Sequence, residues 1–247
     1  GPAETAPTGK KQASFTSANA CAMAFREKDS VDRQLRVCEN NEQYRNDPQH
    51  AEYFKSCDAR TKKFEAQLNR LSASLASCNA STIEAAELEF YESARAAAAS
   101  GDVNAQICYV RGTFFIGRPW TQQEKDAYKA EASKYVDSAF KRGDWRIAEL
   151  LRSATPQVVA QSGLLAAVVN PERANSYRMN RLLRRGTETG EYAQLLDALA
   201  DNPGAPLPPD VKSEADLWVA RTYDMYFSKS ARLTSKPNTC MTSEESP

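Results

Sequence analysis

The sequence has no excess of charge of either sign, no long apolar run and a single histidine. Its 247 residues carry 32 Lys and Arg against 32 Asp and Glu, so the formal net charge is zero. Proteins that bind nucleic acid or anionic lipid surfaces usually present a strong positive field, which this balance does not supply. No apolar run approaches the roughly 18 residues of a transmembrane helix. We therefore expect neither nucleic-acid binding nor a membrane span.

Closely spaced cysteines are missing too, although the chain has six cysteines. No two of them are closer than 17 residues, which excludes the C-x-x-C pairs of zinc sites. His50 is the single histidine that could assist a metal or a thiolate. An even, dispersed set favours three disulfides in an oxidising compartment, with buried cytosolic thiols as the alternative. We expect no cofactor or metal, and a periplasmic or secreted location.

A helix–glycine–helix pattern occurs twice between Glu92 and Leu151. In each copy small residues end one predicted helix, Gly-Asp follows at 101–102 or 143–144, and a second helix begins. Glycine just past a helix end supplies a left-handed cap, and the aspartate caps the next helix. The glycines are 42 positions apart, and a weaker echo follows at Gly186. This recurrence predicts an all-α fold of antiparallel helical hairpins stacked as a short solenoid.

Residues 15–80 are predicted to form a separate helical hairpin. Asp47-Pro48 interrupts an otherwise helical pattern and marks its turn. Residues of the second helix recur every seven positions, which is the spacing of an apolar stripe along one helix of about eight turns. The residues of that stripe are Cys57, Phe64, Leu71 and Cys78.

The hairpin geometry also predicts how the cysteines pair. Two cysteines lie about ten residues from the turn, one on each side of it. The other two lie near the far end of the hairpin, so two nested bridges are expected. A bridge from Cys57 to Cys78 is excluded because they would lie roughly 31 Å apart along one helix. The expected disulfides, the last by elimination, are Cys38–Cys57, Cys21–Cys78 and Cys108–Cys240. A helix break near Asp29-Ser30 is an open alternative, which would bring Cys21 beside Cys38.

Capping and proline signals divide the rest of the chain. Residues 1–14 read as a flexible leader, which suits a tether to a lipid anchor in the native protein as well as a frayed terminus. Gly1-Pro2 within it is typical of the remnant that a protease leaves on removing an expression tag. The further expected segments are a helical-repeat region at 81–201, a proline-rich linker at 202–209, a last helix at 210–228 and a polar tail at 229–247.

Within the repeat region, Ser81–Glu84 and Thr121–Glu124 are predicted capping boxes. The helices that begin at the two Gly-Asp turns should end near Ile116 and Ser153. Pro171 is expected at the first helical position of a later helix. The remaining predicted helices cover 156–168, 171–185 and 189–200.

The segment Tyr91–Ala148 resembles the Sel1-like repeat, a relative of the tetratricopeptide repeat built from antiparallel helix pairs. The matching residues are Ala96-Ala97, Gly101-Asp102, Ala105, Tyr135, Ser138-Ala139 and Gly143-Asp144. Small residues at such positions let neighbouring helices approach closely. The chain departs from the pattern where Cys108-Tyr109 replaces a Leu-Gly pair and Ile147 stands at a small position. The resemblance covers roughly a quarter of the chain and implies a protein-binding adaptor, often of bacterial envelopes.

No pattern in the sequence indicates a reaction centre. His50 at the hairpin turn has only Asp47 and Glu52 as nearby partners, and Ser162 lacks the context of a nucleophile elbow. Four carboxylates near the start of one predicted helix suit the helix dipole and a solvated face better than paired catalytic acids. They are Glu84, Glu87, Glu89 and Glu92. We predict that the protein is not an enzyme.

Aromatic and arginine side chains near the loop between the two copies are the predicted partner-binding residues. Tryptophan with nearby arginine is the composition of interface hot spots. Trp120 is expected to be an exposed anchor, whereas Trp145 is equally compatible with a core position. The arginines at 178–185 lie on one helix face, where an acidic partner or solvent would meet them. The predicted set is Trp120, Arg118, Phe115, Arg111, Trp145, Arg178 and Arg181.

Three functions remain open on the sequence alone. The first is an exported adaptor that binds another protein through the repeat surface. The second is a periplasmic immunity or inhibitor protein that blocks a toxic effector enzyme, with 118–120 or 202–209 as its plug. A cell-wall glycan hydrolase is the least favoured, because no isolated acid stands in an apolar setting.

Overall fold

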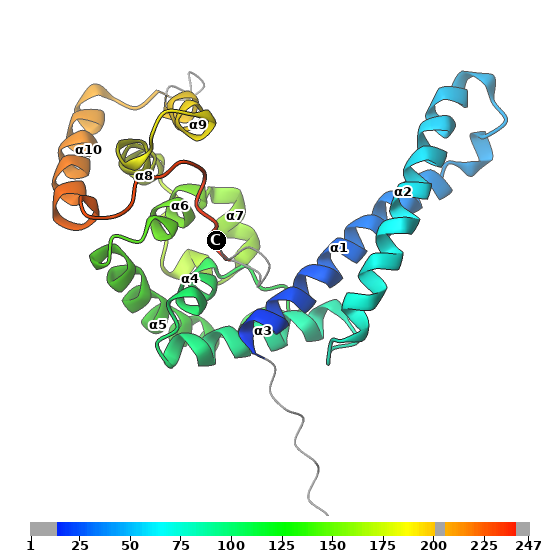
Figure 1. Cartoon of the computed structure of the whole chain (residues 1–247), viewed down its shortest axis with the longest axis horizontal. Helices are drawn as coiled ribbons and strands as arrows, with labels where there is room; N and C mark the ends of the chain where they lie inside the picture. The colour runs from blue at the N-terminus through cyan, green and yellow to red at the C-terminus, as the bar shows by residue number, and fades with distance from the viewer. Residues whose placement is uncertain (1–13, 201–205, 241–247) are drawn as a thin grey trace, which may run out of the picture. The chain divides into compact units, whose positions relative to one another are not determined.

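The protein is all-α, as the sequence predicts, and forms two compact units, residues 1–93 and 94–247 (Figure 1). The computed structural model describes residues 14–200 and 206–240, which contain ten α-helices. Residues 1–13 of the leader, residues 201–205 with the first half of the proline-rich linker, and the end of the tail (241–247) lie outside the described residues. Across the described ranges, no helix combines the length and apolarity needed to cross a membrane.

The first unit is built on the predicted antiparallel hairpin of α1 (Phe15–Glu39) and α2 (Ala51–Ala76). The hydroxyl of Ser14 accepts a hydrogen bond from the Ser17 amide at 3.3 Å and begins α1. Helix α1 continues without interruption through Asp29-Ser30, so the alternative with a break there is wrong. The connection contains two short 3₁₀ turns, and the Asp47 carboxylate accepts from the Gln49 amide at 2.9 Å.

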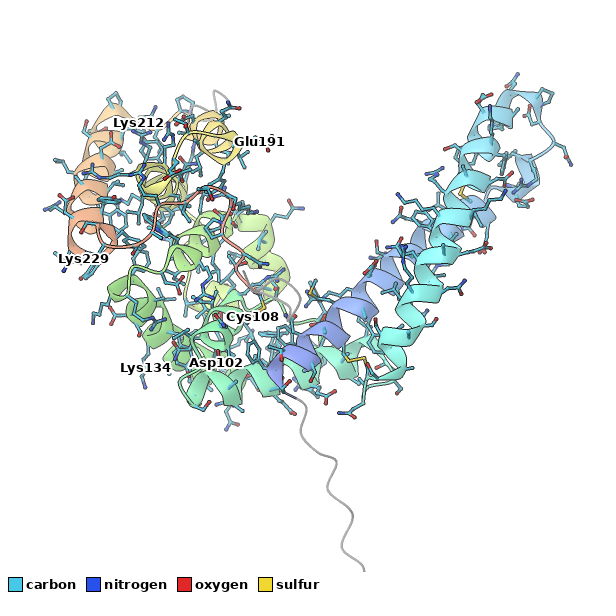
Figure 2. The ribbon with its side chains drawn as sticks, in the orientation of Figure 1. Asp102, Cys108, Lys134, Glu191, Lys212 and Lys229 are labelled. Atoms are coloured by element: carbon cyan, nitrogen blue, oxygen red, sulfur yellow. A yellow bond between two sulfur atoms is a disulfide. The ribbon has the colours of Figure 1, made fainter. Side chains whose placement is uncertain are left out.

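All three predicted disulfides are present. Cys38–Cys57 and Cys21–Cys78 hold α1 against α2 at two levels, with Cα–Cα distances of 5.9 and 5.8 Å. In the second unit Cys108–Cys240 joins α4 (Val103–Arg111) to the C-terminal segment, with a Cα–Cα distance of 4.8 Å. Cys108 is buried inside this unit (Figure 2). Three disulfides indicate that the protein matures in an oxidising, extracytoplasmic compartment.

A buried ion pair anchors the part of α3 (Ile83–Ala99) that belongs to the first unit. Glu87 is fully buried, and both of its carboxylate oxygens accept hydrogen bonds from the guanidinium of Arg26 on α1. The prediction of a solvated acidic face is therefore wrong for Glu87. Helix α3 also begins one residue later than its predicted capping box, because the Thr82 hydroxyl, and not Ser81, accepts from the Ala85 amide at 3.2 Å.

The second unit packs its later helices around α8. Its remaining helices are α5 (Gln122–Lys141), α6 (Trp145–Ser153), α7 (Pro156–Ser162), α8 (Arg173–Gly186), α9 (Glu191–Ala200) and α10 (Pro209–Thr222). Helix α8 contacts α6, α9 and α10. The core that these helices share consists of Trp145, Ala148, Met179, Leu182, Leu183, Tyr192, Leu196, Val219 and Phe227.

Several predicted helix ends in this unit are wrong, and glycine explains two of them. Helix α4 stops at Arg111 because Gly112 adopts a left-handed φ of +63°, and α7 stops at Ser162 because Gly163 has a φ of +67°. Helix α8 begins at Arg173, so Pro171 is not its first residue. The last helix continues from α10 into a π-helical turn (Tyr223–Phe227).

The predicted polar tail is structured as far as Cys240. After the π-helical turn the chain runs back over the second unit. The Ser230 hydroxyl donates to the Gly143 carbonyl at 2.8 Å, and the Leu233 amide donates to the Gly186 carbonyl at 2.9 Å. An isolated β-bridge between Thr187 and Leu233 continues this contact. The C-terminal segment is thus part of the fold of this unit.

We expect the Cys108–Cys240 disulfide to hold that segment in place. Its cysteines are 132 positions apart, and the chain-entropy estimate for such a loop is about 5 kcal/mol of stability. The double variant Cys108→Ala/Cys240→Ala should lose about that much free energy of unfolding in a urea titration, and limited proteolysis should cut residues 228–240 first.

The double variant Cys21→Ala/Cys78→Ala is the matched control, because it removes a disulfide from the other unit. Its C-terminal segment should resist the protease as well as the wild type does. Equal protection of that segment in the Cys108→Ala/Cys240→Ala protein would contradict the prediction.

Candidate functional site

The two Gly-Asp turns have the predicted geometry. Gly101 and Gly143 both take left-handed conformations, with φ of +99° and +66°. The Asp102 carboxylate accepts hydrogen bonds from the amides of Asn104 and Ala105 at 2.8 and 3.0 Å, and so begins α4. In the second copy the Asp144 carboxylate accepts from the Arg146 amide at 3.1 Å and begins α6.

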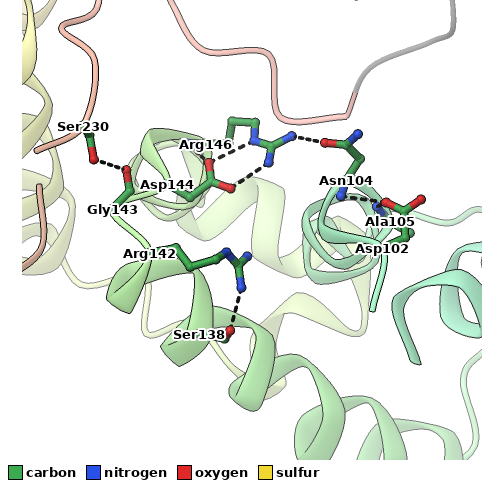
Figure 3. A network of polar contacts seen from close by, with 9 residues as sticks. All are labelled: Asp102, Asn104, Ala105, Ser138, Arg142, Gly143, Asp144, Arg146 and Ser230. Carbon is green, nitrogen blue, oxygen red and sulfur yellow. Dashed lines mark hydrogen bonds and ion pairs between the residues drawn. The ribbon is translucent and has the colours of Figure 1, made fainter. Parts of the chain in front are cut away.

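A side-chain contact joins the two turns (Figure 3). Arg146 donates from Nη1 to Oδ1 of Asn104 at 2.5 Å, while Nε and Nη2 bind the Asp144 carboxylate at 2.9 and 2.7 Å. Asn104 and Arg146 each stand three residues after the glycine of their own turn. Equivalent positions of the two copies therefore touch, and the turns lie side by side.

Trp145 does not lie on the surface as a partner-binding residue would. Its side chain is only 8% exposed, its indole N–H donates to the Ala231 carbonyl at 2.8 Å, and its ring lies 4.5 Å from that of Phe227. A Cβ added at Gly186 would lie 2.1 Å from the indole. Gly186 is the last residue of α8 and has no left-handed φ, so it gives room to Trp145 and is not a third copy of the cap.

Trp120 is buried as well, and its prediction as an exposed anchor is wrong. It is 8% exposed, and its ring lies so close to Gly163 that an added Cβ would stand 3.0 Å from Cδ1. Arg118 lies over the Trp120 ring at 5.9 Å and forms an ion pair with Glu124 at 2.7 Å. That pair, together with the predicted capping box at Thr121, lowers the pKa of Glu124 to about 2.

Phe115 and Arg111 are members of this loop region that keep solvent access. Phe115 is 48% exposed, and Arg111 at the end of α4 is half-buried. Phe114 is only 4% exposed and belongs to the core. The predicted hot spot at 111–120 therefore reduces to one exposed aromatic side chain among basic residues.

The arginines of α8 pair with acids of the same chain. Arg178 contacts Glu214 at 3.1 Å and Arg181 contacts Asp216 at 3.5 Å, both on α10. The neighbouring Arg184 binds the Asp197 carboxylate of α9 at 2.9 Å. The acidic partner that the arginine face implies is thus present within the protein. These pairs are largely exposed, so each contributes little stability.

The two remaining candidates from the sequence, Ser162 and His50, are in contact with neighbouring residues of the fold. The Ser162 hydroxyl is 3% exposed and accepts from the Leu165 amide at 2.7 Å, which begins a short 3₁₀ turn. His50 stacks on Tyr44 with ring centroids 5.4 Å apart, and its Nδ1 lies 3.1 Å from the Asp47 carboxylate. Ser162 therefore fixes a turn after α7, and His50 packs within the hairpin connection.

The most unusual side chain of the second unit, Glu149, went unnoticed in the sequence. It is fully buried, and Arg152 donates to its carboxylate from Nη2 and Nε at 2.6 and 2.8 Å. The Tyr192 hydroxyl donates at 2.8 Å, and Lys236 of the C-terminal segment approaches to 3.5 Å. Spaced three residues apart on a helix, Glu149 and Arg152 look like an ordinary surface pair, and only the packing of α9 over them shows the burial.

Burial and charge oppose each other at Glu149. Burial raises the pKa of the carboxyl group, but the hydrogen bonds and charge of Arg152, with the Tyr192 hydroxyl, outweigh it and hold the pKa below its ordinary value. Burial and the adjacent carboxylate raise the pKa of Tyr192 well above 10. Glu149 is therefore an ionised group that links α6, α9 and the C-terminal segment.

Comparison with known proteins adds no relative to these observations. No family model and no curated protein matches the sequence, and no solved structure matches the fold. The fold and its contacts define the class: an all-α protein of packed helix pairs with three disulfides.

We predict that Gly186→Ala destabilises the protein by about 1–3 kcal/mol, because the new methyl group overlaps the Trp145 ring. In a Trp145→Leu background the same change should cost less than about 0.5 kcal/mol, since alanine favours a helix over glycine. Urea unfolding of the four proteins measures both values. An equal cost in the two backgrounds would show that Gly186 has another role.

The ionised state of Glu149 predicts a pH dependence of stability. Its pKa is lowered on folding, so its contribution is complete above the unfolded value of about 4.3 and is lost as the pH falls through the folded value. Glu149→Gln should cost about 3–5 kcal/mol at pH 7 by leaving Arg152 unpaired, and should flatten the fall in stability below about pH 4.3. The exposed Asp137→Asn is the control. An unchanged acid slope in Glu149→Gln would refute the assignment.

Proposed function

We propose that the protein is an exported, non-catalytic adaptor that binds another protein through a short Sel1- or TPR-like helical solenoid in its second unit. The observation that carries the proposal is the contact between Asn104 and Arg146, which brings equivalent positions of two helix–Gly-Asp–helix copies together. Stacked copies of one helical unit build an extended surface, and binding is the usual task of such surfaces. The three disulfides support export to the periplasm or beyond.

Within this unit the loop between α4 and α5 is the best contact surface. Its first end is fixed where the Tyr128 hydroxyl donates to the Val110 carbonyl at 2.6 Å, beside Gly112. Its second end is fixed by the burial of Trp120. Phe115 stands half-exposed between the two fixed ends. Because the loop is fixed at both ends, binding through the Phe115 side chain costs little conformational entropy. A low entropic cost of this kind is a property of interface hot spots.

The inhibitor hypothesis receives less support from the same loop. Its plug at 118–120 depends on an exposed Trp120, which is buried, and on Arg118, which is engaged with Glu124. Half of the other candidate plug, 202–209, lies outside the described residues. The adaptor is therefore the function that we put forward.

Site-specific photo-cross-linking tests this proposal. A benzophenone amino acid replaces Phe115 in the full-length protein within its own organism, and the same probe replaces exposed Lys129 on α5 as the control. We expect one discrete protein adduct at position 115 and none at position 129. Phe115→Asp should then weaken binding of the purified partner at least about tenfold, with an unchanged Tm.

The cross-linking result distinguishes the adaptor from the inhibitor. An adduct with an enzyme whose activity falls on binding would replace the adaptor with an inhibitor. Failure of position 115 to form an adduct, while position 129 forms one, would reject the proposed surface.

A further inference from the structure

A polar pocket of about 250 Å³ lies in the second unit, between the end of α6, the start of α7, the outer face of α8 and the end of α9. Nothing in the proposed protein-binding surface uses it. The polar residues that line it are Arg152, Ser153, Thr155, Arg173, Ser176, Tyr177 and Asn180. Leu199 adds an apolar patch at the end of α9.

Asn180 is the feature that points to a ligand. The residue is 4% exposed, yet neither its amide nitrogen nor its amide oxygen has a hydrogen-bond partner among the described residues. Buried side-chain amides are nearly always hydrogen-bonded, because an unpaired polar group away from water raises the free energy of the folded state. A molecule that offers both an acceptor and a donor would satisfy Asn180.

The charge of the pocket indicates the sign of that molecule. Of the described residues that line the pocket, two are arginines and none is acidic. Arg152 is held rigidly because Nε and Nη2 bind the buried Glu149, which leaves Nη1 outside that ion pair. The Ser176 hydroxyl donates to the Arg152 carbonyl at 3.2 Å and so further fixes this wall. A preorganised guanidinium beside a second one favours an anion with planar oxygens.

We propose that this pocket binds a small organic acid, a free carboxylate that carries a hydroxyl or amide N–H on a neighbouring atom. The carboxylate meets Arg152 and Arg173. One carboxylate oxygen also accepts from Nδ2 of Asn180, and the adjacent hydroxyl or amide N–H donates to its Oδ1, so that both orphaned atoms are paired. Inorganic phosphate has tetrahedral oxygens and no planar carboxylate, so it serves as the control for a planar acid over a tetrahedral anion.

The test uses the oxidised full-length protein and four probes. Lactate and N-acetylglycine carry a carboxylate beside a donor; N-acetylglycinamide lacks the carboxylate, and inorganic phosphate lacks the planar acid. The readout is the side-chain NH₂ resonance of Asn180 in ¹H–¹⁵N spectra. We expect a saturable shift with lactate or N-acetylglycine at millimolar concentration, and none with the other two.

Variants separate binding from folding. Asn180→Leu should weaken binding at least about tenfold while the Tm stays equal or rises, because an unpaired buried amide is replaced by an apolar side chain of similar size. Arg173→Gln, at the start of α8, should weaken binding by a similar factor and keeps the test decisive if Asn180→Leu does not fold. Arg142→Gln, whose guanidinium donates to Ser138 at 2.6 Å outside the pocket, should bind as the wild type does.

Two results would overturn the proposal. One is the absence of a saturable shift with either acid, or an equal response to inorganic phosphate. The other is an Asn180→Leu protein with a lowered Tm and unchanged binding, which would show that Asn180 serves the fold alone. Either result leaves the adaptor proposal intact, because that proposal rests on the Asn104–Arg146 contact and the α4–α5 loop, neither of which lines this pocket.

Discussion

The second unit depends on one backbone constraint, the change of chain direction between two consecutive helices within a Gly-Asp pair. Only glycine adopts the required left-handed conformation without strain, and the aspartate immediately satisfies the free amides of the next helix. So short a turn fixes where α4 and α6 begin, which brings Asn104 and Arg146 into contact. At Gly143 the constraint is stricter, because an added Cβ would stand 2.4 Å from the Tyr226 carbonyl oxygen.

The C-terminal segment connects the second Gly-Asp turn to the end of α8 and so closes the second unit. It meets Gly143 through Ser230, Trp145 through the Ala231 carbonyl, and Gly186 through Leu233. Contacts between residues so distant in the chain cost loop-closure entropy, and the Cys108–Cys240 disulfide offsets part of that cost in the oxidised protein. The same segment brings Lys236 toward the buried Glu149, so charge pairing and chain closure reinforce each other.

The sequence predicts those features that depend on local chemistry or on spacing along one helix. The Asp102 and Asp144 caps, the Thr121 capping box and the two hairpin disulfides follow from such rules, and Cys108–Cys240 then follows by elimination. The exposure of tryptophan does not, because Trp120 and Trp145 are buried against glycines that lie 43 and 41 positions further along the chain. Glu149 and Asn180 likewise look like ordinary helix-surface residues until α9 and the pocket walls are placed around them.

A double-mutant cycle between Asn104 and Arg146 tests most directly whether the two copies stack. Urea unfolding would be measured for the wild type, Asn104→Ala, Arg146→Ala and the double variant. Side-by-side turns predict a favourable coupling of about 0.5–1.5 kcal/mol, the range for a hydrogen bond to a charged group near the surface. Additive single effects, with no coupling beyond error, would contradict the stacked arrangement and the binding surface built on it.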